Sequence, residues 1–132
     1  MVNEAFEKLI TCLETRGLMY ITPFNYSNLI SYIFGYDRAL CDNEKSTVLD
    51  GFKELITAKY GSHSCIHWAY IIPEFLAEND EEAIKLFFTF YHELVIIKKT
   101  KGIQFLKNEY ERIGNFKRKR KTNIKWPIKL KR

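Results

Sequence analysis

The sequence has few of the residues that form disulfide bonds or tight turns. Its 132 residues include three cysteines, six glycines and three prolines. The cysteines, Cys12, Cys41 and Cys65, are odd in number and far apart, which argues against a disulfide framework and is typical of a reducing cytosol. The glycines are scattered singly, so the sequence has no glycine-rich loop that would bind phosphate.

Long apolar runs are also missing. No stretch approaches the roughly 18 to 20 apolar residues that span a bilayer, and the opening MVNEAFEKLITC carries acids without the apolar run of a signal peptide. Hydrophobic residues make up 46% of the chain and aromatic residues 15%. A chain of this length and composition can bury one core. We therefore expect a small soluble cytoplasmic domain with no membrane partner.

Acidic residues are absent from one part of the chain. Residues 117–132 contain nine lysines and arginines and no acid, although the whole chain has 21 basic and 16 acidic residues. Residues 1–116 thus keep 12 basic and 16 acidic residues, a net charge of −4. This asymmetry predicts an acidic helical domain over 1–116 and a basic tail over 117–132.

Apolar residues recur at helical spacing through most of the chain. We expect an all-α compact bundle of five or six helices, with an extended basic strap at the C-terminus. The expected helices cover 3–17, 26–42, 47–61, 81–102 and 102–114, with a short one ending near Pro73. The expected caps are Asn3, Ser46 or Thr47, Ser62 or Ser64, and Asp80. Gly35 lies inside the second helix and would mark close helix packing.

No arrangement of reactive residues predicts catalysis, a metal or a cofactor. His63, Cys65 and His67 are metal-ligand types within five residues. On a helix the two histidines would share a face and Cys65 would not, and a second pair of ligands at zinc-like spacing is missing. Cys65 and Cys41 are expected to be buried, and Cys12 to lie on the polar side of its helix. We expect a protein that is not an enzyme.

One ordered set of motifs is more specific than the composition. RGLMYI occurs at 16–21, LISYIFGYDRAL at 29–40, IHWAYII at 66–72 and EEAIKLFF at 81–88, with Phe52 between the second and third. This order, which covers about two thirds of the chain, resembles a family of small all-helical bacterial proteins. Many of these look like immunity proteins of contact-dependent or polymorphic toxin systems. In that pattern a proline often follows the arginine, whereas here the residue is Gly17, and nothing beyond residue 100 has a counterpart.

Most motif residues also have an ordinary structural interpretation. Six of them sit where a bundle core is expected: Met19, Phe34, Phe52, Trp68, Phe87 and Phe88. Arg16, Tyr20 and Tyr36 would form a polar contact group at one end of the bundle, or an interface.

The resemblance implies a protein that binds and neutralises a cognate toxin without catalysis. Nuclease toxins tend to be basic, so their inhibitors commonly offer carboxylates. The densest acidic groups, and thus the candidate partner-binding residues, are Asp42, Glu44, Glu78, Asp80, Glu81 and Glu82. The alternative is that these acids are ordinary solvated loop and helix-start residues.

The basic tail supports a second functional interpretation. Lys117, Arg118, Lys119, Arg120 and Lys121 could contact the phosphates of a nucleic acid. Beyond them, Ile124, Trp126, Ile128 and Leu130 alternate with lysines and a proline, which predicts an extended segment over 124–130 lying with its apolar side on the acidic domain. Since only the tail is basic, nucleic acid is not expected to be the main partner.

Overall fold

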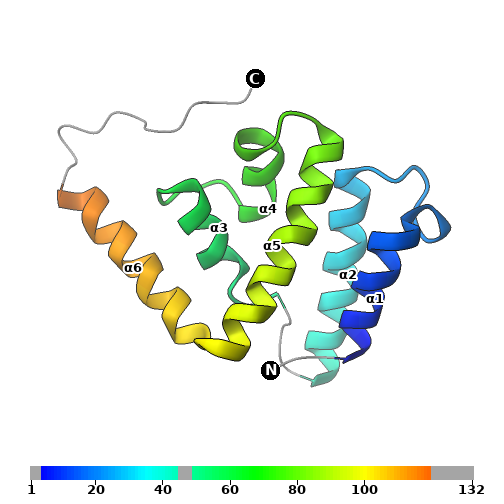
Figure 1. Ribbon diagram of the computed structural model, residues 1–132, viewed down its shortest axis with the longest axis horizontal. Coiled ribbons are helices and arrows are strands. Elements are labelled where there is room, and N and C mark those ends of the chain that lie inside the picture. Colours follow the sequence, from blue (N-terminus) through cyan, green and yellow to red (C-terminus); the bar gives the residue numbers. More distant parts are fainter. Residues whose placement is uncertain (1–3, 45–48, 120–132) are drawn as a thin grey trace. The chain divides into compact units, whose positions relative to one another are not determined.

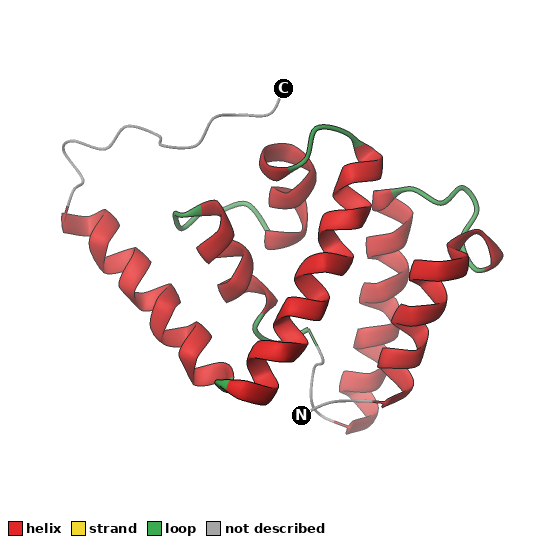
Figure 2. Ribbon diagram, viewed as in Figure 1, coloured by secondary structure: helices red, strands yellow, loops and turns green. Residues whose placement is uncertain are grey.

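The computed structural model describes residues 4–44 and 49–119, and every element in these ranges is helical (Figures 1 and 2). The prediction of an all-α fold is confirmed. The predicted cap Asn3, the predicted caps Ser46 and Thr47, and the tail segment 124–130 lie outside the described residues. No helix within the described ranges is both long and apolar enough to cross a membrane.

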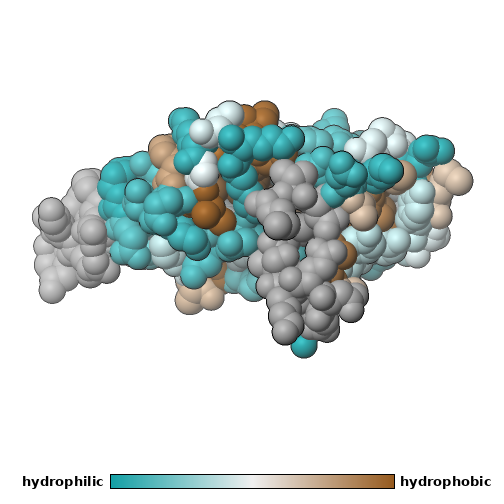
Figure 3. Space-filling view, turned by 90° about the horizontal axis from the view of Figure 1, so that it is seen from below, coloured by the Kyte–Doolittle hydropathy of each residue, from teal (hydrophilic) through white to brown (hydrophobic). Residues whose placement is uncertain are grey.

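The chain divides into two compact units, with the boundary between Asp50 and Gly51. Two such units can belong to one domain or to two, so the predicted single helical domain over 1–116 stays a prediction. The face seen in Figure 3 is mostly hydrophilic, with hydrophobic residues showing only in small areas. On this face the apolar side chains are therefore mainly turned inward, as expected for folded helical units.

The first unit is a pair of helices joined by a tight connection. Helix α1 (Glu4–Arg16) leads into the 3₁₀ turn η1 (Gly17–Met19), and α2 (Tyr26–Glu44) runs back beside α1 (Figure 1). The ring of Phe6 in α1 lies 5.8 Å from that of Tyr36 in α2. The fully buried apolar residues of these helices follow the predicted spacing: Phe6, Ile10, Leu13, Leu29 and Ile33.

The second unit is arranged around a short helix, α3 (Phe52–Tyr60). It contacts α4 (Trp68–Ile71), the π-helical turn η2 (Ile72–Leu76), α5 (Asp80–Thr100) and α6 (Ile103–Lys119). Because α3 touches every other element of the unit, its side chains form the centre of that unit's core.

Phe52, the first residue of α3, holds these elements together through ring stacking. It is completely buried, with the ring of Trp68 at 4.5 Å and 7° on α4 and that of Phe87 at 5.4 Å and 5° on α5. Stacked aromatic pairs contribute about 0.5 to 1.5 kcal/mol each beyond the area that they bury. The expected core positions of Phe52, Phe87 and Phe88 are confirmed, whereas Trp68 and Phe34 are half-buried.

Helix α3 begins five residues later than predicted. The residue before Phe52 is Gly51, whose φ of +102° is left-handed and therefore incompatible with helix. A side chain on Gly51 would also crowd Leu94, since a Cβ there would lie 3.0 Å from its Cδ1 atom. The expected helical position of Leu49 is therefore wrong, although Leu49 is buried.

The helix after α3 is capped by a different residue than expected. The His67 ring accepts a hydrogen bond from the Ala69 amide at 3.1 Å, so neither Ser62 nor Ser64 caps α4. The helical path also continues past Pro73, because proline is tolerated in the first turn of η2, where its missing N–H needs no partner.

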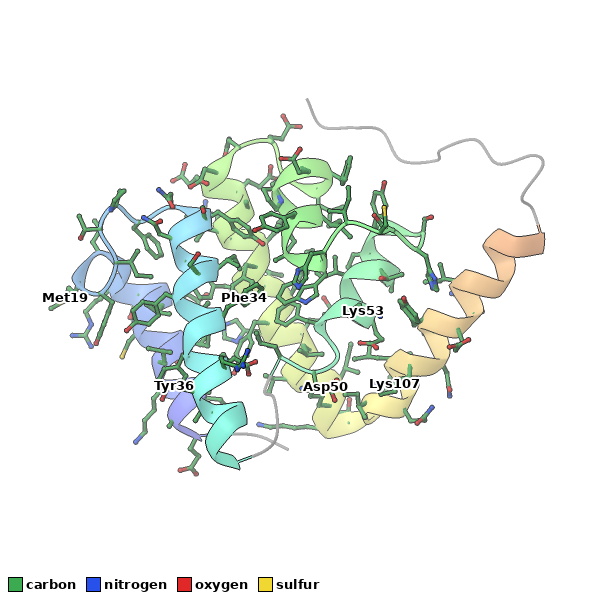
Figure 4. The ribbon with its side chains drawn as sticks, turned by 180° about the vertical axis from the view of Figure 1, so that it is seen from behind. Met19, Phe34, Tyr36, Asp50, Lys53 and Lys107 are labelled. Carbon is green, nitrogen blue, oxygen red and sulfur yellow. The ribbon has the colours of Figure 1, made fainter. Side chains whose placement is uncertain are left out.

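Two side chains expected in the core are exposed. Met19 points away from the helices of its unit (Figure 4), because the turn η1 directs it to solvent. Cys65 is exposed in the loop before α4, whereas Cys12 is half-buried. Both residues lie in connections between helices, where the exposure of a side chain depends on the path of the backbone.

Gly35 does not mark close helix packing. It is exposed on α2, and a Cβ added there would meet no atom within 4 Å. Glycine in a helix interior costs about 0.5 to 1 kcal/mol relative to alanine. Its only clear effect on this helix is therefore a loss of stability.

We predict that Gly35→Ala raises the free energy of unfolding by about 0.5 to 1 kcal/mol in urea denaturation. Gly17→Ala is the matched control and should lower it, because the added Cβ would lie 2.5 Å from the Phe24 ring. A destabilised Gly35→Ala protein would mean that this face of α2 is covered by something else.

Candidate functional site

The acidic segment before α5 has a defined backbone conformation. Asn79 Oδ1 accepts a hydrogen bond from the Glu82 amide at 2.8 Å, and Glu82 Oε1 accepts one from the Glu78 amide at 2.6 Å. The first bond satisfies an amide that the helix start leaves without a partner, and the second ties the residue before the cap to the first turn. The cap of α5 is therefore Asn79 and not Asp80, which is the first helical residue.

The four predicted acids of this segment have different roles. Glu82 is half-buried and its carboxylate holds the backbone, whereas Glu78, Asp80 and Glu81 are exposed. Carboxylates near a helix N-terminus are stabilised by the helix dipole by about 0.3 to 1 kcal/mol. The result is an acidic group of three exposed carboxylates on a rigid backbone, which we call the α5 acidic start.

The other two predicted acids belong to a separate surface. Asp42 and Glu44 lie in the last turn of α2, in the first unit, and their side chains are outside the description. The α5 acidic start belongs to the second unit. The two acidic groups therefore belong to different units.

Part of the predicted nucleic-acid-binding run is helical. Lys117, Arg118 and Lys119 form the end of α6, which continues beyond the predicted end at 114. Cations in the last turn of a helix interact favourably with its dipole. Arg120 and Lys121 lie outside the described residues, so phosphate binding by this run stays a prediction.

The histidines near Cys65 have structural contacts. His67 caps α4, as described above, while His63 reaches α6, where its Nε2–H donates to the Tyr110 carbonyl at 2.8 Å. The two rings also stack at 4.0 Å. Within the described ranges, no group of three His, Cys, Asp or Glu side chains is arranged to hold a metal ion.

The contact group between α3 and α6 was missed by sequence reasoning. Lys53 of α3 places its ammonium 4.9 Å from the centre of the Tyr110 ring, and Lys107 of α6 lies 3.8 Å from the Glu54 carboxylate. Figure 4 shows Lys53 and Lys107 on these two neighbouring helices. Spacing along the chain gives no signal for such contacts, because their members lie more than forty residues apart.

The chain was compared with protein-family models, with curated proteins and with solved structures, and none of the three comparisons gave a match. Its resemblance to immunity proteins therefore rests on the sequence motifs alone. The function that these motifs imply is accordingly put forward as a proposal.

We predict that Asn79→Ala lowers the free energy of unfolding by about 0.5 to 2 kcal/mol, because it removes the cap of α5. Glu81→Ala, at an exposed position in the first turn, should lower it by less, about 0.3 to 0.5 kcal/mol, because it removes only the interaction of one exposed carboxylate with the helix dipole. Denaturant melts of both variants test this distinction between the structural and the exposed members of the segment. Equal losses would contradict it.

Proposed function

We propose that the protein binds and neutralises a partner protein without catalysis, and that this partner is a basic bacterial toxin, such as a nuclease, met in the cytoplasm. The observation that carries the proposal is the α5 acidic start. Its three exposed carboxylates, Glu78, Asp80 and Glu81, project from a backbone that Asn79 and Glu82 hold in place.

A rigid acidic group suits an inhibitor for two physical reasons. Charges complementary to a partner raise the rate of association, which matters for a protein that must reach a toxin before its substrate does. A backbone that is already ordered also loses less conformational entropy on binding. The hydrogen bonds at the start of α5 provide this order in the free protein.

The sequence motifs support the same function. RGLMYI, LISYIFGYDRAL, IHWAYII and EEAIKLFF occur in the order that resembles the immunity-protein family. The last of these motifs begins at Glu81, inside the α5 acidic start. Nucleic-acid binding by residues 117–121 is the alternative function, and it rests on the basic composition of this run alone.

The test is binding to the product of the neighbouring gene, carrying a substitution that inactivates it. We predict that it co-purifies with the full-length chain, and that Glu81→Lys weakens binding about tenfold, mainly through slower association at low salt. Glu111→Lys is the matched control, because Glu111 is an exposed acid of the same unit on α6 and the change in net charge is identical.

Different results would contradict the immunity function and the assignment of its contact surface. If the neighbouring gene product does not bind, the immunity function is wrong. If it binds with equal affinity to both charge-reversed variants, the function stands but the α5 acidic start is not the contact surface. Binding of RNA that weakens steeply with salt and requires residues 117–132 would instead support the alternative.

A further inference from the structure

Three consecutive large apolar side chains are exposed at the connection after α1. Leu18, Met19 and Tyr20 expose 68%, 74% and 46% of their surface, and Tyr32 of α2 exposes 38%. Single exposed apolar residues are common on proteins, but a run of three consecutive ones is unfavourable unless it serves a function. We call these four residues the η1 apolar patch.

The backbone that presents the patch is anchored on both sides. The Gly17 carbonyl accepts hydrogen bonds from the amides of Tyr20 and Ile21 at 3.0 and 2.9 Å. Ile21 is buried, and Gly17 lies against the Phe24 ring so closely that no side chain fits there. The exposure of Leu18 and Met19 is therefore imposed by a fixed turn.

The start of α2 fixes the other end of this connection. Asn25 Oδ1 accepts a hydrogen bond from the Asn28 amide at 2.8 Å, and the Asn28 side chain donates to the Pro23 carbonyl at 2.8 Å. The whole connection thus has an ordered backbone before any partner arrives. Pre-ordered surfaces of this kind bind at a lower entropic cost than flexible loops.

Polar groups border the patch and give it a chemical character. The pKa of the Tyr20 hydroxyl is raised, mainly by its hydrogen bond with Cys12 and by repulsion from the ionised form of that thiol. Smaller effects come from Arg16, which lowers this pKa, and from Tyr32, which raises it. Arg16, the last residue of α1, directly precedes the turn η1 and thus borders the patch. Arg16 itself is exposed.

The composition of this surface matches the centre of a protein interface. Tyrosine, methionine and arginine are enriched there, and tyrosine and arginine are frequent among the residues that contribute most to binding. An arginine beside an apolar patch is complementary to a carboxylate, which its planar guanidinium binds through two hydrogen bonds.

Charge decides between the possible occupants. The alternating segment 124–130 carries Lys125 and Lys129, which have the same sign as Arg16 and are thus poor complements to it. An anionic membrane would require several clustered cations, whereas the exposed residues next to Arg16 include the acid Glu14. A carboxylate-bearing protein surface fits the patch better than either.

We propose that the η1 apolar patch is a docking surface for a partner protein that presents an apolar recess bordered by a carboxylate, with Met19 and Tyr20 entering the recess and Arg16 pairing with the carboxylate. This surface lies in the first unit and does not depend on the α5 acidic start. The proposal therefore stands or falls separately from the proposed function.

The test places a photo-crosslinking residue, benzoylphenylalanine, at position 19 of the full-length chain in the cells from which its gene comes. The crosslinked protein is then purified and titrated against unmodified and substituted chains. We expect Met19→Lys and Arg16→Glu each to weaken binding about tenfold or more. Ala39→Lys, exposed on α2 about two turns from Tyr32, should leave the affinity unchanged.

Three results would overturn the proposal. They are crosslinks only to residues 120–132 of the same chain, crosslinks only to a second copy of the chain, and no loss of affinity in either variant. Failure to crosslink any protein, together with co-sedimentation with vesicles of phosphatidylcholine and phosphatidylglycerol, would assign the patch to a membrane surface instead. Unchanged thermal unfolding of Met19→Lys, expected because Met19 is exposed, shows that lost binding does not reflect misfolding.

Discussion

The position of Phe52 between two aromatic rings is the interaction on which the second unit depends. The segment that carries the α5 acidic start is bordered by Trp68 on one side and Phe87 on the other, and both rings stack on Phe52. Gly51 makes this possible, because its left-handed backbone starts α3 at Phe52. A completely buried ring some thirty residues earlier in the chain thus holds the two helices that flank this exposed acidic segment.

Rigidity is the property that both proposed surfaces share. At the start of α5 it comes from the hydrogen bonds of Asn79 and Glu82, and at η1 from the Gly17 carbonyl and the Phe24 ring. The two surfaces differ in chemistry, since one offers carboxylates and the other apolar side chains beside an arginine. They also lie in different units, so a partner of one need not contact the other.

The helices were predictable because apolar spacing is a local property of the sequence, and Phe52 and Phe87 were correctly assigned to the core on that basis. Helix boundaries were less predictable, because Asn79 and Asp80 are both good caps and only the observed hydrogen bonds distinguish them. Exposure depends on the path of the backbone between helices, which explains why Met19 was wrongly placed inside. Contacts such as that of His63 with α6 join distant positions and could not be predicted from one sequence.

Partner binding at the α5 acidic start is tested most directly by hydrogen–deuterium exchange of the full-length chain, alone and in complex with the inactive product of the neighbouring gene. We expect the amides of residues 78–82, at the start of α5, to exchange more slowly in the complex, because the partner covers the exposed carboxylates beside them. Slower exchange confined to α6, with residues 78–82 unchanged, would show that the α5 acidic start does not bind the partner.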